Sequence, residues 1–291
     1  MAATSIGIDS VVAASGTLEL DDGLSVRRLG YGAMRLTGKG IWGPPADEEN
    51  AVAVLRRAVE LGVNLVDTAD SYGPEVSEQL IRRALHPYDG VMVVTKAGFL
   101  RPAPGQWVTC GKQEYLRQQC ELSLRRLGVE RIDLFQLHRV DSKVPAEDQF
   151  GTLRELQQEG KIRLVGLSEV SVEQVEHART IVEISTVQNR YNVLDRGSDD
   201  VLRYCTEQRI GFMPWYPVAS GKLAEPGGPV AVAAERLDAT PAQVSLAWLL
   251  QRSSMMLPIP GTSSLEHLEE NCQAATLRLD RDLVDALDDV A

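Results

Sequence analysis

The chain has 291 residues, 44% of them hydrophobic, which is enough for one sizeable core or two smaller ones. Its 30 basic and 41 acidic residues give a net charge of −11, which argues against a nucleic-acid or anionic-membrane partner but leaves room for a local basic pocket that binds a phosphate. No apolar run reaches the roughly 20 residues that span a bilayer, residues 1–5 do not resemble a signal peptide, and the four cysteines show no CxxC spacing, so we expect a cytoplasmic protein without a membrane partner.

Strand-like and helical patterns alternate along most of the chain. Residues 1–15 carry no strong pattern and are left as an unassigned extension. Residues 17–26 have the pattern of a β-hairpin that turns at Asp22-Gly23, and we expect it to close the floor of a barrel. Short apolar runs typical of strands then lie at 26–34, 64–67, 91–95, 132–138, 162–167, 184–188, 210–215 and 255–259.

The stretches between these runs have apolar residues three and four positions apart, as on one face of a helix. One stripe ends before Gly62 and another before Gly128, and both glycines are placed to cap a helix C terminus. Eight strands that alternate with helices, without a linker rich in Pro, Gly or Ser, predict one domain over residues 1–291. Its fold class is α/β, a closed (β/α)8 barrel of the TIM type. The two stripes are Ala51, Val54, Leu55 and Ala58, and Leu116, Cys120, Leu124 and Leu127.

Residues 38–43 match the GxGxxG pattern of dinucleotide-binding sheets. That motif requires a helix to open at its third glycine, whereas Pro44-Pro45 follow here and restrict the backbone to extended conformations. We interpret the match as accidental, so a nucleotide that binds this chain has to bind in another way.

Four polar residues follow strand-like runs: Asp67, Tyr72, Lys96 and His138. Because the C-terminal ends of parallel barrel strands meet at one mouth, we expect the four side chains to converge there. This set suits proton donation to a carbonyl: the carboxylate steadies the ammonium, the ammonium lowers the pKa of the phenol, and the imidazole hydrogen-bonds the substrate oxygen. Each residue alone has a structural explanation, but together they predict a catalytic site.

Several segments, in this order, resemble the aldo-keto reductase family over residues 26–288: 62–73, Thr95-Lys96, Leu137-His138, 165–168, 187–189 and 259–264. The resemblance implies an NADPH-dependent (NADPH/NADP) enzyme that reduces a small-molecule aldehyde or ketone. The resemblance further implies that hydride passes directly to the carbonyl carbon, with Tyr72 as the acid. The blocks at 29–34, 42–47, 71–74 and 261–264 resemble a bacterial branch of the family that interconverts pyridoxine and pyridoxal.

The resemblance also implies how the cofactor is held. Ser168 and Gln188 are expected to bind the nicotinamide carboxamide, and Trp215 to stack on the ring where the family more often has Tyr. Glu169 stands where Asn is common, so that carboxamide contact is not transferred. The other implied cofactor contacts are Gly32, Met34, Tyr216, Pro217, Val218, Ser220, Glu270 and Asn271.

The implied phosphate site lies at the start of the helical stretch 265–271, where free backbone amides can hold an anion. Gly261 and His267 stand where the family often has Lys and Arg, which leaves Thr262 and Ser263 as hydroxyl ligands. We therefore expect NADPH to be preferred over NADH, but by a smaller margin than a Lys/Arg site provides.

Two tryptophans fall in loops that are expected to emerge at the catalytic mouth. Trp42 follows the first strand and Trp107 lies in the long loop 99–111, so the two indoles can flank a flat ring. The alternative, that each indole packs against its own loop, stays open. Together with the shared blocks, the pair favours a planar aromatic aldehyde such as pyridoxal. The short segment 277–291 predicts an open pocket.

Two other classes of function stay open. A protein that binds a nicotinamide nucleotide without catalysis, and regulates a partner, does not need the four residues intact. A metal-dependent barrel hydrolase needs several His and carboxylate ligands on one ion. The chain has four histidines and no His-x-His pair, and His86, His177 and His267 fall in helical or loop stretches, so we expect no metal. The sequence predicts no oligomeric state.

Overall fold

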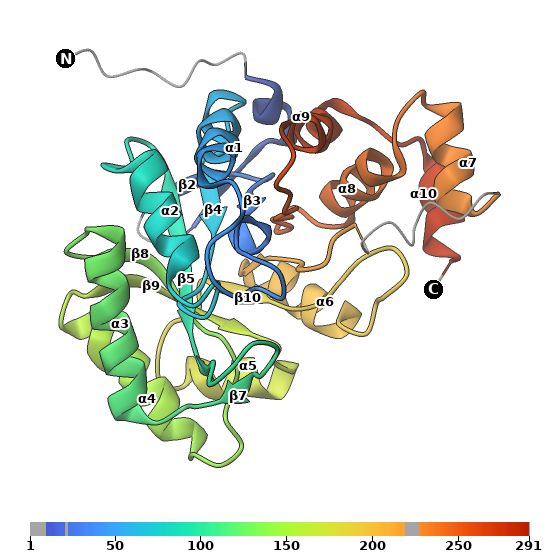
Figure 1. Cartoon of the computed structure of the whole chain (residues 1–291). Coiled ribbons are helices and arrows are strands. Elements are labelled where there is room, and N and C mark those ends of the chain that lie inside the picture. Colours follow the sequence, from blue (N-terminus) through green and yellow to red (C-terminus); the bar gives the residue numbers. More distant parts are fainter. Residues whose placement is uncertain (1–9, 21–22, 219–226, 291) are drawn as a thin grey trace.

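In the computed structural model, which describes residues 10–20, 23–218 and 227–290, seven parallel strands form one sheet in the order β11-β10-β9-β8-β5-β4-β3 (Figure 1). Neighbouring strands run parallel throughout this sheet. Its strands are β3 (Tyr31–Gly32), β4 (Leu65–Asp67), β5 (Met92–Ala97), β8 (Ile132–Leu137), β9 (Ile162–Ser168), β10 (Thr186–Gln188) and β11 (Gly211–Phe212).

Residues 255–260 occupy the eighth position and close the barrel between β11 and β3. On one side Phe212 N donates to Met255 O and Leu257 N donates to Phe212 O; on the other, Gly30 N donates to Pro258 O. Two residues of the segment are prolines, which have no N–H to donate into a ladder. The predicted strand at 255–259 is therefore an extended segment with one isolated bridge, between Phe212 and Met256.

Two other predicted strands differ from the structure in extent. The run at 26–34 splits, because its first residues belong to the N-terminal hairpin and only Tyr31–Gly32 enters the barrel as β3. The run at 210–215 contributes only β11, after which the chain leaves the sheet. The closed (β/α)8 architecture is nevertheless the one that the alternation predicted.

Helices cover the outside of the barrel (Figure 1), and the predicted stripes face inward. The C-terminal helices α7, α8 and α10 gather on the side opposite α3 and α4. Gly128 caps α3 at φ +74°, a left-handed conformation that glycine adopts without strain. The helices are α1 (Glu48–Glu60), α2 (Val76–Leu85), α3 (Gln113–Leu127), α4 (Ala146–Gln158), α5 (Val172–Arg179), α6 (Asp199–Gln208), α7 (Pro229–Arg236), α8 (Pro241–Arg252), α9 (Leu265–Gln273) and α10 (Arg281–Asp288), with 3-10 turns η1 (Val11–Ser15), η3 (Ala33–Leu36) and η5 (Ala274–Thr276).

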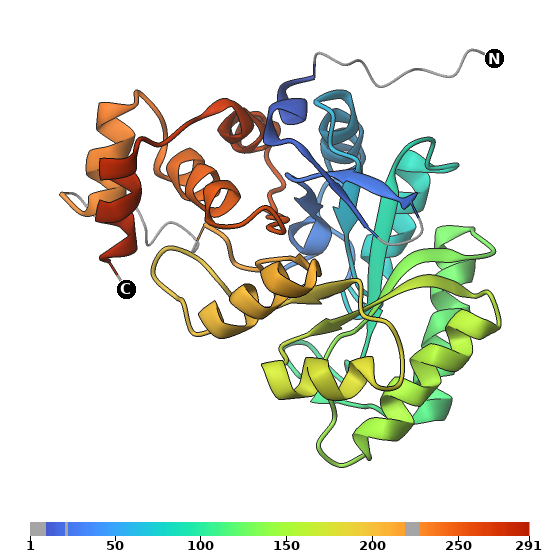
Figure 2. The same cartoon turned by 180° about the vertical axis from the view of Figure 1, so that it is seen from behind.

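The predicted floor is present. Strands β1 (Thr17–Glu19) and β2 (Ser25–Arg27) form an antiparallel hairpin that lies across one end of the barrel (Figure 2). Its side chains Leu18, Leu20 and Val26 pack into one buried cluster with barrel residues such as Leu65 and Leu257. Asp22 of the predicted turn and residues 1–9 lie outside the described residues.

The loop after β5 contains a second hairpin that the sequence did not predict. Its strands are β6 (Phe99–Leu100) and β7 (Val108–Thr109), paired antiparallel. Residues 38–43, which match the GxGxxG pattern, lie in a loop. The next α-helix begins at Glu48 rather than at Gly43, as expected for an accidental match. Within the described residues, no helix is both long and apolar enough to cross a bilayer.

Candidate active site

A cavity of about 330 Å³ opens at the C-terminal ends of the barrel strands. The last residues of β3, β4, β9 and β10 reach it, as expected for a parallel barrel. The predicted site residues that line it are Gly32, Met34, Asp67, Tyr72, Trp107, His138, Ser168, Gln188, Trp215, Tyr216, Pro217, Val218 and Gly261.

Other predicted residues lie elsewhere. Lys96 is fully buried and binds Asp67 rather than lining the cavity. Ser220 lies outside the described residues. Trp42, Thr262, Ser263, His267, Glu270 and Asn271 are not among the lining residues. Sequence reasoning missed four residues that do line the cavity, Arg35, Phe99, Arg139 and Ile259.

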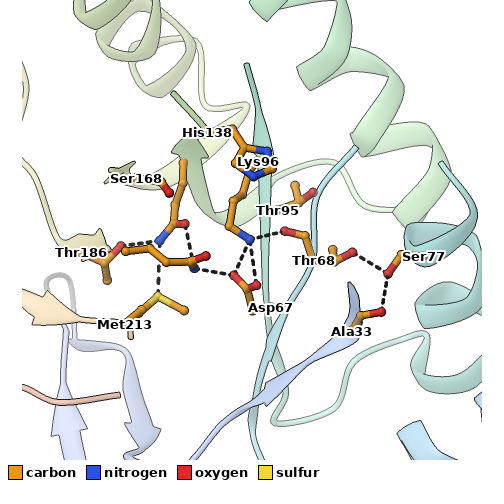
Figure 3. A network of polar contacts seen from close by, with 12 residues as sticks. Ala33, Asp67, Thr68, Ser77, Thr95, Lys96, His138, Ser168, Thr186 and Met213 are labelled. Carbon is orange, nitrogen blue, oxygen red and sulfur yellow. Dashed lines mark hydrogen bonds and ion pairs between the residues drawn. The ribbon is translucent and has the colours of Figure 1, made fainter. Parts of the chain in front are cut away.

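Lys96 and Asp67 form a buried ion pair beneath the cavity (Figure 3). Lys96 Nζ lies 2.7 Å and 2.8 Å from the two carboxylate oxygens of Asp67 and 2.7 Å from Thr68 O. Burial raises the pKa of Asp67 and lowers the pKa of Lys96, and the attraction between the two charges opposes both shifts. The pair therefore places two opposite charges, which neutralise each other, in fixed positions next to Tyr72.

Tyr72 lies above this pair, with its ring centroid 5.3 Å from Lys96 Nζ. The expected lowering of the Tyr72 pKa by Lys96 is not what the structure shows. Burial raises the pKa of Tyr72, the charge of Asp67 raises it further, and Arg139 opposes these effects. The donor capacity of Lys96 is directed to Asp67 and Thr68. Tyr72 is thus a protonated phenol at neutral pH, able to donate its proton.

His138 lies beside Tyr72 in the cavity wall and is buried. The two ring centroids are 5.9 Å apart at 81°, and Phe99 packs on His138 at 4.8 Å. Ser71 Oγ lies 3.4 Å from His138 Nδ1, which leaves Nε2 as the nitrogen for a substrate oxygen. Burial, then the charges of Lys96 and Arg139, lower the pKa of His138 well below its ordinary value, so the imidazole is neutral at pH 7.

Gly98 makes room for this arrangement at the end of β5. Its φ is +148°, and a Cβ there would lie 3.0 Å from Arg139 N and 3.1 Å from His138 Cβ. Both the backbone angle and the close approach require glycine. The residue thus lets the end of β5 pass directly beside the histidine.

Gln188 and Gln136 connect the ion pair to Thr186 on β10 through hydrogen bonds. Gln188 Nε2 donates to Asp67 Oδ1 at 2.9 Å and to Gln136 Oε1 at 3.2 Å. Gln136 Nε2 in turn donates to Thr186 Oγ1 at 3.0 Å. The Gln188 amide, the expected carboxamide ligand, is therefore held in one orientation at the cavity wall.

Glu169 has a role that the sequence did not reveal. Its carboxylate accepts a hydrogen bond from Trp215 Nε1 at 2.5 Å and another from Arg190 N at 2.7 Å. The residue has a left-handed backbone, with φ +55°. Because the indole N–H is bonded to a fixed carboxylate, the ring of Trp215 is held in place with one part exposed to the cavity.

The expected phosphate end of the cavity is built from close-packed backbone. A Cβ on Gly32 would lie 2.7 Å from Ile259 O, and one on Gly261 would lie 2.6 Å from Gly32 O. A lysine cannot replace Gly261 unless this backbone moves. Ser264 caps α9 by accepting a hydrogen bond from His267 N at 3.3 Å. Asn271, on the same helix, is buried.

The two indoles expected to flank a substrate contact an arginine. The guanidinium carbon of Arg101 lies 3.6 Å from the ring centroid of Trp107 and 5.5 Å from that of Trp42. Arg101 also donates to Ser71 O at 2.7 Å, which ties this loop to the loop after β4 that carries Tyr72. Trp107 packs against Phe99 at 5.3 Å, and it is this pair that lines the cavity.

In the part of the chain that the structure describes, no three His, Cys, Asp or Glu side chains come together as a metal-binding group. The metal-dependent hydrolase is thus left without a set of ligands in these residues.

Comparisons with known proteins identify the family of the chain. A model of the aldo/keto reductase family matches residues 28–291. An uncharacterised oxidoreductase of Schizosaccharomyces pombe is 49% identical over 275 residues, covering 94% of this chain and 90% of the relative. Pyridoxine 4-dehydrogenase of Escherichia coli is 42% identical over 274 residues, covering 92% and 96%. A solved aldo/keto reductase of Klebsiella pneumoniae, in complex with NADP and acetate, has a TM-score of 0.78 at 27% identity and covers 94% of both chains.

Proposed function

Since the chain belongs to the aldo/keto reductase family and is thus a nicotinamide-dependent oxidoreductase of carbonyl groups, we propose that it reduces aldehydes and ketones with NADPH, with Tyr72 as the proton donor. One observation carries the proposal. A protonated Tyr72 and a neutral His138 lie side by side in the wall of the cavity, next to the buried Lys96–Asp67 pair.

In the proposed reaction a hydride adds to the carbonyl carbon, and Tyr72 gives its phenolic proton to the carbonyl oxygen. A neutral His138 can donate a hydrogen bond to that same oxygen and so sets the orientation of the carbonyl. When the proton leaves, negative charge develops on Tyr72, and the Lys96 ammonium is close enough to stabilise it. A proton from water then restores the phenol.

The residues at the other side of the cavity fit a nicotinamide cofactor, which supplies the hydride when it is bound. Trp215 offers a flat indole face that Glu169 holds in place, and Ser168 and Gln188 offer polar groups beside it. This fit is consistent with the Klebsiella pneumoniae structure, which contains NADP. The roles of Gly32, Met34, residues 216–218, Glu270 and Asn271 remain proposed contacts of the same cofactor.

A preference for NADPH over NADH is supported by the charge near α9. Arg35 lines the cavity beside Gly261, and α9 begins at Leu265, where backbone amides at a helix N terminus can hold an anion. We propose that Arg35 supplies part of the positive charge that the family draws from Lys and Arg at positions 261 and 267. Thr262, Ser263 and His267 complete the proposed 2′-phosphate site.

We propose pyridoxal as a substrate, reduced to pyridoxine. The support is the 42% identity to pyridoxine 4-dehydrogenase together with an aromatic wall beside His138. We assign this wall to Phe99 and Trp107, which line the cavity, rather than to Trp42, whose ring lies next to Arg101. A flat ring is therefore expected against Phe99 and Trp107.

Steady-state oxidation of NADPH by pyridoxal and by 4-nitrobenzaldehyde tests the proposal. Turnover of both supports the reductase and its substrate, whereas turnover of the nitro compound alone removes pyridoxal and leaves the general reductase. NADPH binding, measured by quenching of tryptophan fluorescence, without turnover of either aldehyde contradicts the reductase and supports the non-catalytic binding protein. A chelator is expected to have no effect.

We also propose that the chain works as one domain in a reducing cytoplasm. The described strands and helices surround one barrel core, and all four cysteines are buried and free.

A further inference from the structure

Arg139 directly follows His138, but the proposed reaction gives it no role. Its side chain lines the cavity and is only partly buried. Nη1 donates to His138 O at 2.6 Å and to Ser168 Oγ at 3.1 Å, which anchors the guanidinium at the ends of β8 and β9. Its Nε and Nη2 make no hydrogen bond to another described residue, so one side of the planar fork remains available at the cavity.

The charge of Arg139 is not cancelled by a paired carboxylate within the described residues. Burial lowers the pKa of Arg139 and the charge of Glu169 opposes this shift, but the two side chains form no ion pair. The Glu169 carboxylate instead accepts hydrogen bonds from Trp215 Nε1 and from the backbone N–H of Arg190. Asp67 is neutralised by Lys96, and His138 is uncharged. The wall beside the reacting groups is therefore positive, although the chain as a whole carries a net charge of −11.

Two other arginines near the cavity are differently engaged. Arg101 stacks on Trp107 and donates to the backbone oxygens of Ser71 and Gln106. Arg35 lies beside Gly261, at the end of the cavity proposed for the cofactor phosphate. Arg139 alone of these three adjoins His138, and its guanidinium lies over the Phe99 ring at 5.3 Å, on the wall proposed to hold the substrate.

We propose that Arg139 binds a carboxylate on the substrate, so that the enzyme prefers aldehydes and ketones that carry a carboxylate over uncharged ones. The proposal rests on the reductase function and adds a substrate class to it. A guanidinium matches a carboxylate through two parallel hydrogen bonds, and the Nη1 anchor leaves the other side of the fork for them. A substrate held there has its carbonyl placed near His138 and Tyr72.

The test compares the 2-, 3- and 4-carboxybenzaldehydes with their methyl esters. The ester is the more electron-withdrawing group, so a preference for the acid cannot come from the intrinsic reactivity of the carbonyl. We expect kcat/KM for at least one acid to exceed that of its ester by roughly 10-fold or more, as charged hydrogen bonds typically provide. If no acid is preferred while the esters are reduced, this proposal fails alone; if no aldehyde is reduced, the reductase function itself fails.

Variants assign the preference to the residue. Arg139→Gln should lower the acid-to-ester ratio of kcat/KM by roughly 10- to 100-fold, and Arg139→Lys should retain part of it because charge survives without the fork. The exposed Arg154 on α4 gives the matched control Arg154→Gln, whose ratio should equal that of the native enzyme. An acid preference that survives in Arg139→Gln overturns the proposal.

The position of Arg139 beside Ser168 makes the cofactor its other possible ligand. Titration of NADPH into Arg139→Gln, followed by tryptophan fluorescence, separates the two. A Kd for NADPH within about threefold of the native value, with a reduced acid-to-ester ratio, supports substrate recognition. A large rise in that Kd, with equal losses of kcat/KM for acid and ester, shows that the guanidinium serves the cofactor and overturns the proposal.

Discussion

Replacement of Lys96 by methionine tests the buried ion pair. The Lys96 side chain is 0% exposed and that of Asp67 is 4% exposed, so methionine fills the space but leaves the carboxylate buried without its counter-charge. Gln188 still donates one hydrogen bond to it. Removing one partner of a buried pair costs about 3–5 kcal/mol of unfolding free energy. For a chain of this size we expect Tm to fall by about 5–8 °C.

The loss should depend on pH, and its sign follows from Asp67. In the variant, burial raises the pKa of Asp67 without the opposing effect of Lys96. Above the unfolded pKa of about 3.9, the folded variant then holds a proton that the unfolded chain has lost. Stability therefore falls with rising pH, by about 1.4 kcal/mol per unit, until the folded pKa is passed. The variant should be more destabilised at pH 8 than at pH 5.

Urea or thermal unfolding followed by circular dichroism measures this at both pH values. The double variant Asp67→Asn/Lys96→Met should recover part of the lost stability because no charge remains buried. Lys161→Met removes a partly exposed lysine from its ion pairs with Glu121 and Glu159, and as the control it should cost less than about 1 kcal/mol. A Lys96→Met enzyme as stable as the native one at pH 8, or a loss that does not change with pH, refutes the reasoning.

Three further outcomes are expected. Glu169→Gln weakens the bond that holds Trp215, so the Kd for NADPH, measured by fluorescence, should rise roughly 5- to 30-fold; an unchanged Kd removes Glu169 from cofactor binding. Gly261→Lys forces a Cβ against Gly32 O, so the kcat/KM ratio for NADPH over NADH should fail to rise, although the change adds the family's usual cation; a clear rise contradicts the packing argument. Burial raises the pKa of Asp70 to about 8, and its Oδ1 has no hydrogen-bond partner within the described residues. The stability of the native enzyme should therefore fall as pH rises from about 4 to 8. Asp70→Asn should flatten this pH dependence, and identical stability curves for the two proteins would show that Asp70 does not cause it.

The sequence predicted the barrel and the meeting of Asp67, Tyr72, Lys96 and His138, because strand ends are visible as apolar runs and parallel topology brings them to one mouth. The eighth strand was harder to predict in detail. Residues 255–260, which include two prolines, close the barrel through hydrogen bonds made by their carbonyl groups and by a few N–H groups. The apolar composition of this segment does not distinguish it from a regular strand.

Loop residues were predicted less well, because contacts distant in sequence determine them. Trp42 was expected at the substrate, but Arg101, which is fixed by Ser71 O, stands beside its ring. The sequence shows that Arg139 follows His138. The orientation of the Arg139 side chain, however, depends on its hydrogen bond to Ser168 at the end of the next strand. The pKa of Tyr72 was expected to fall, since the sequence indicates a nearby lysine but not where that lysine donates its hydrogen bonds.

The proton donor is the central claim, and the turnover of Tyr72→Phe tests it most directly. NADPH oxidation with 4-nitrobenzaldehyde should show kcat lowered by roughly 10²- to 10⁴-fold, with the Kd for NADPH nearly unchanged because only the phenolic oxygen is lost. Tyr204→Phe, which removes a hydroxyl bonded to Arg179 on the outer helices, is the matched control and should keep native turnover. Near-normal kcat in Tyr72→Phe would contradict the account.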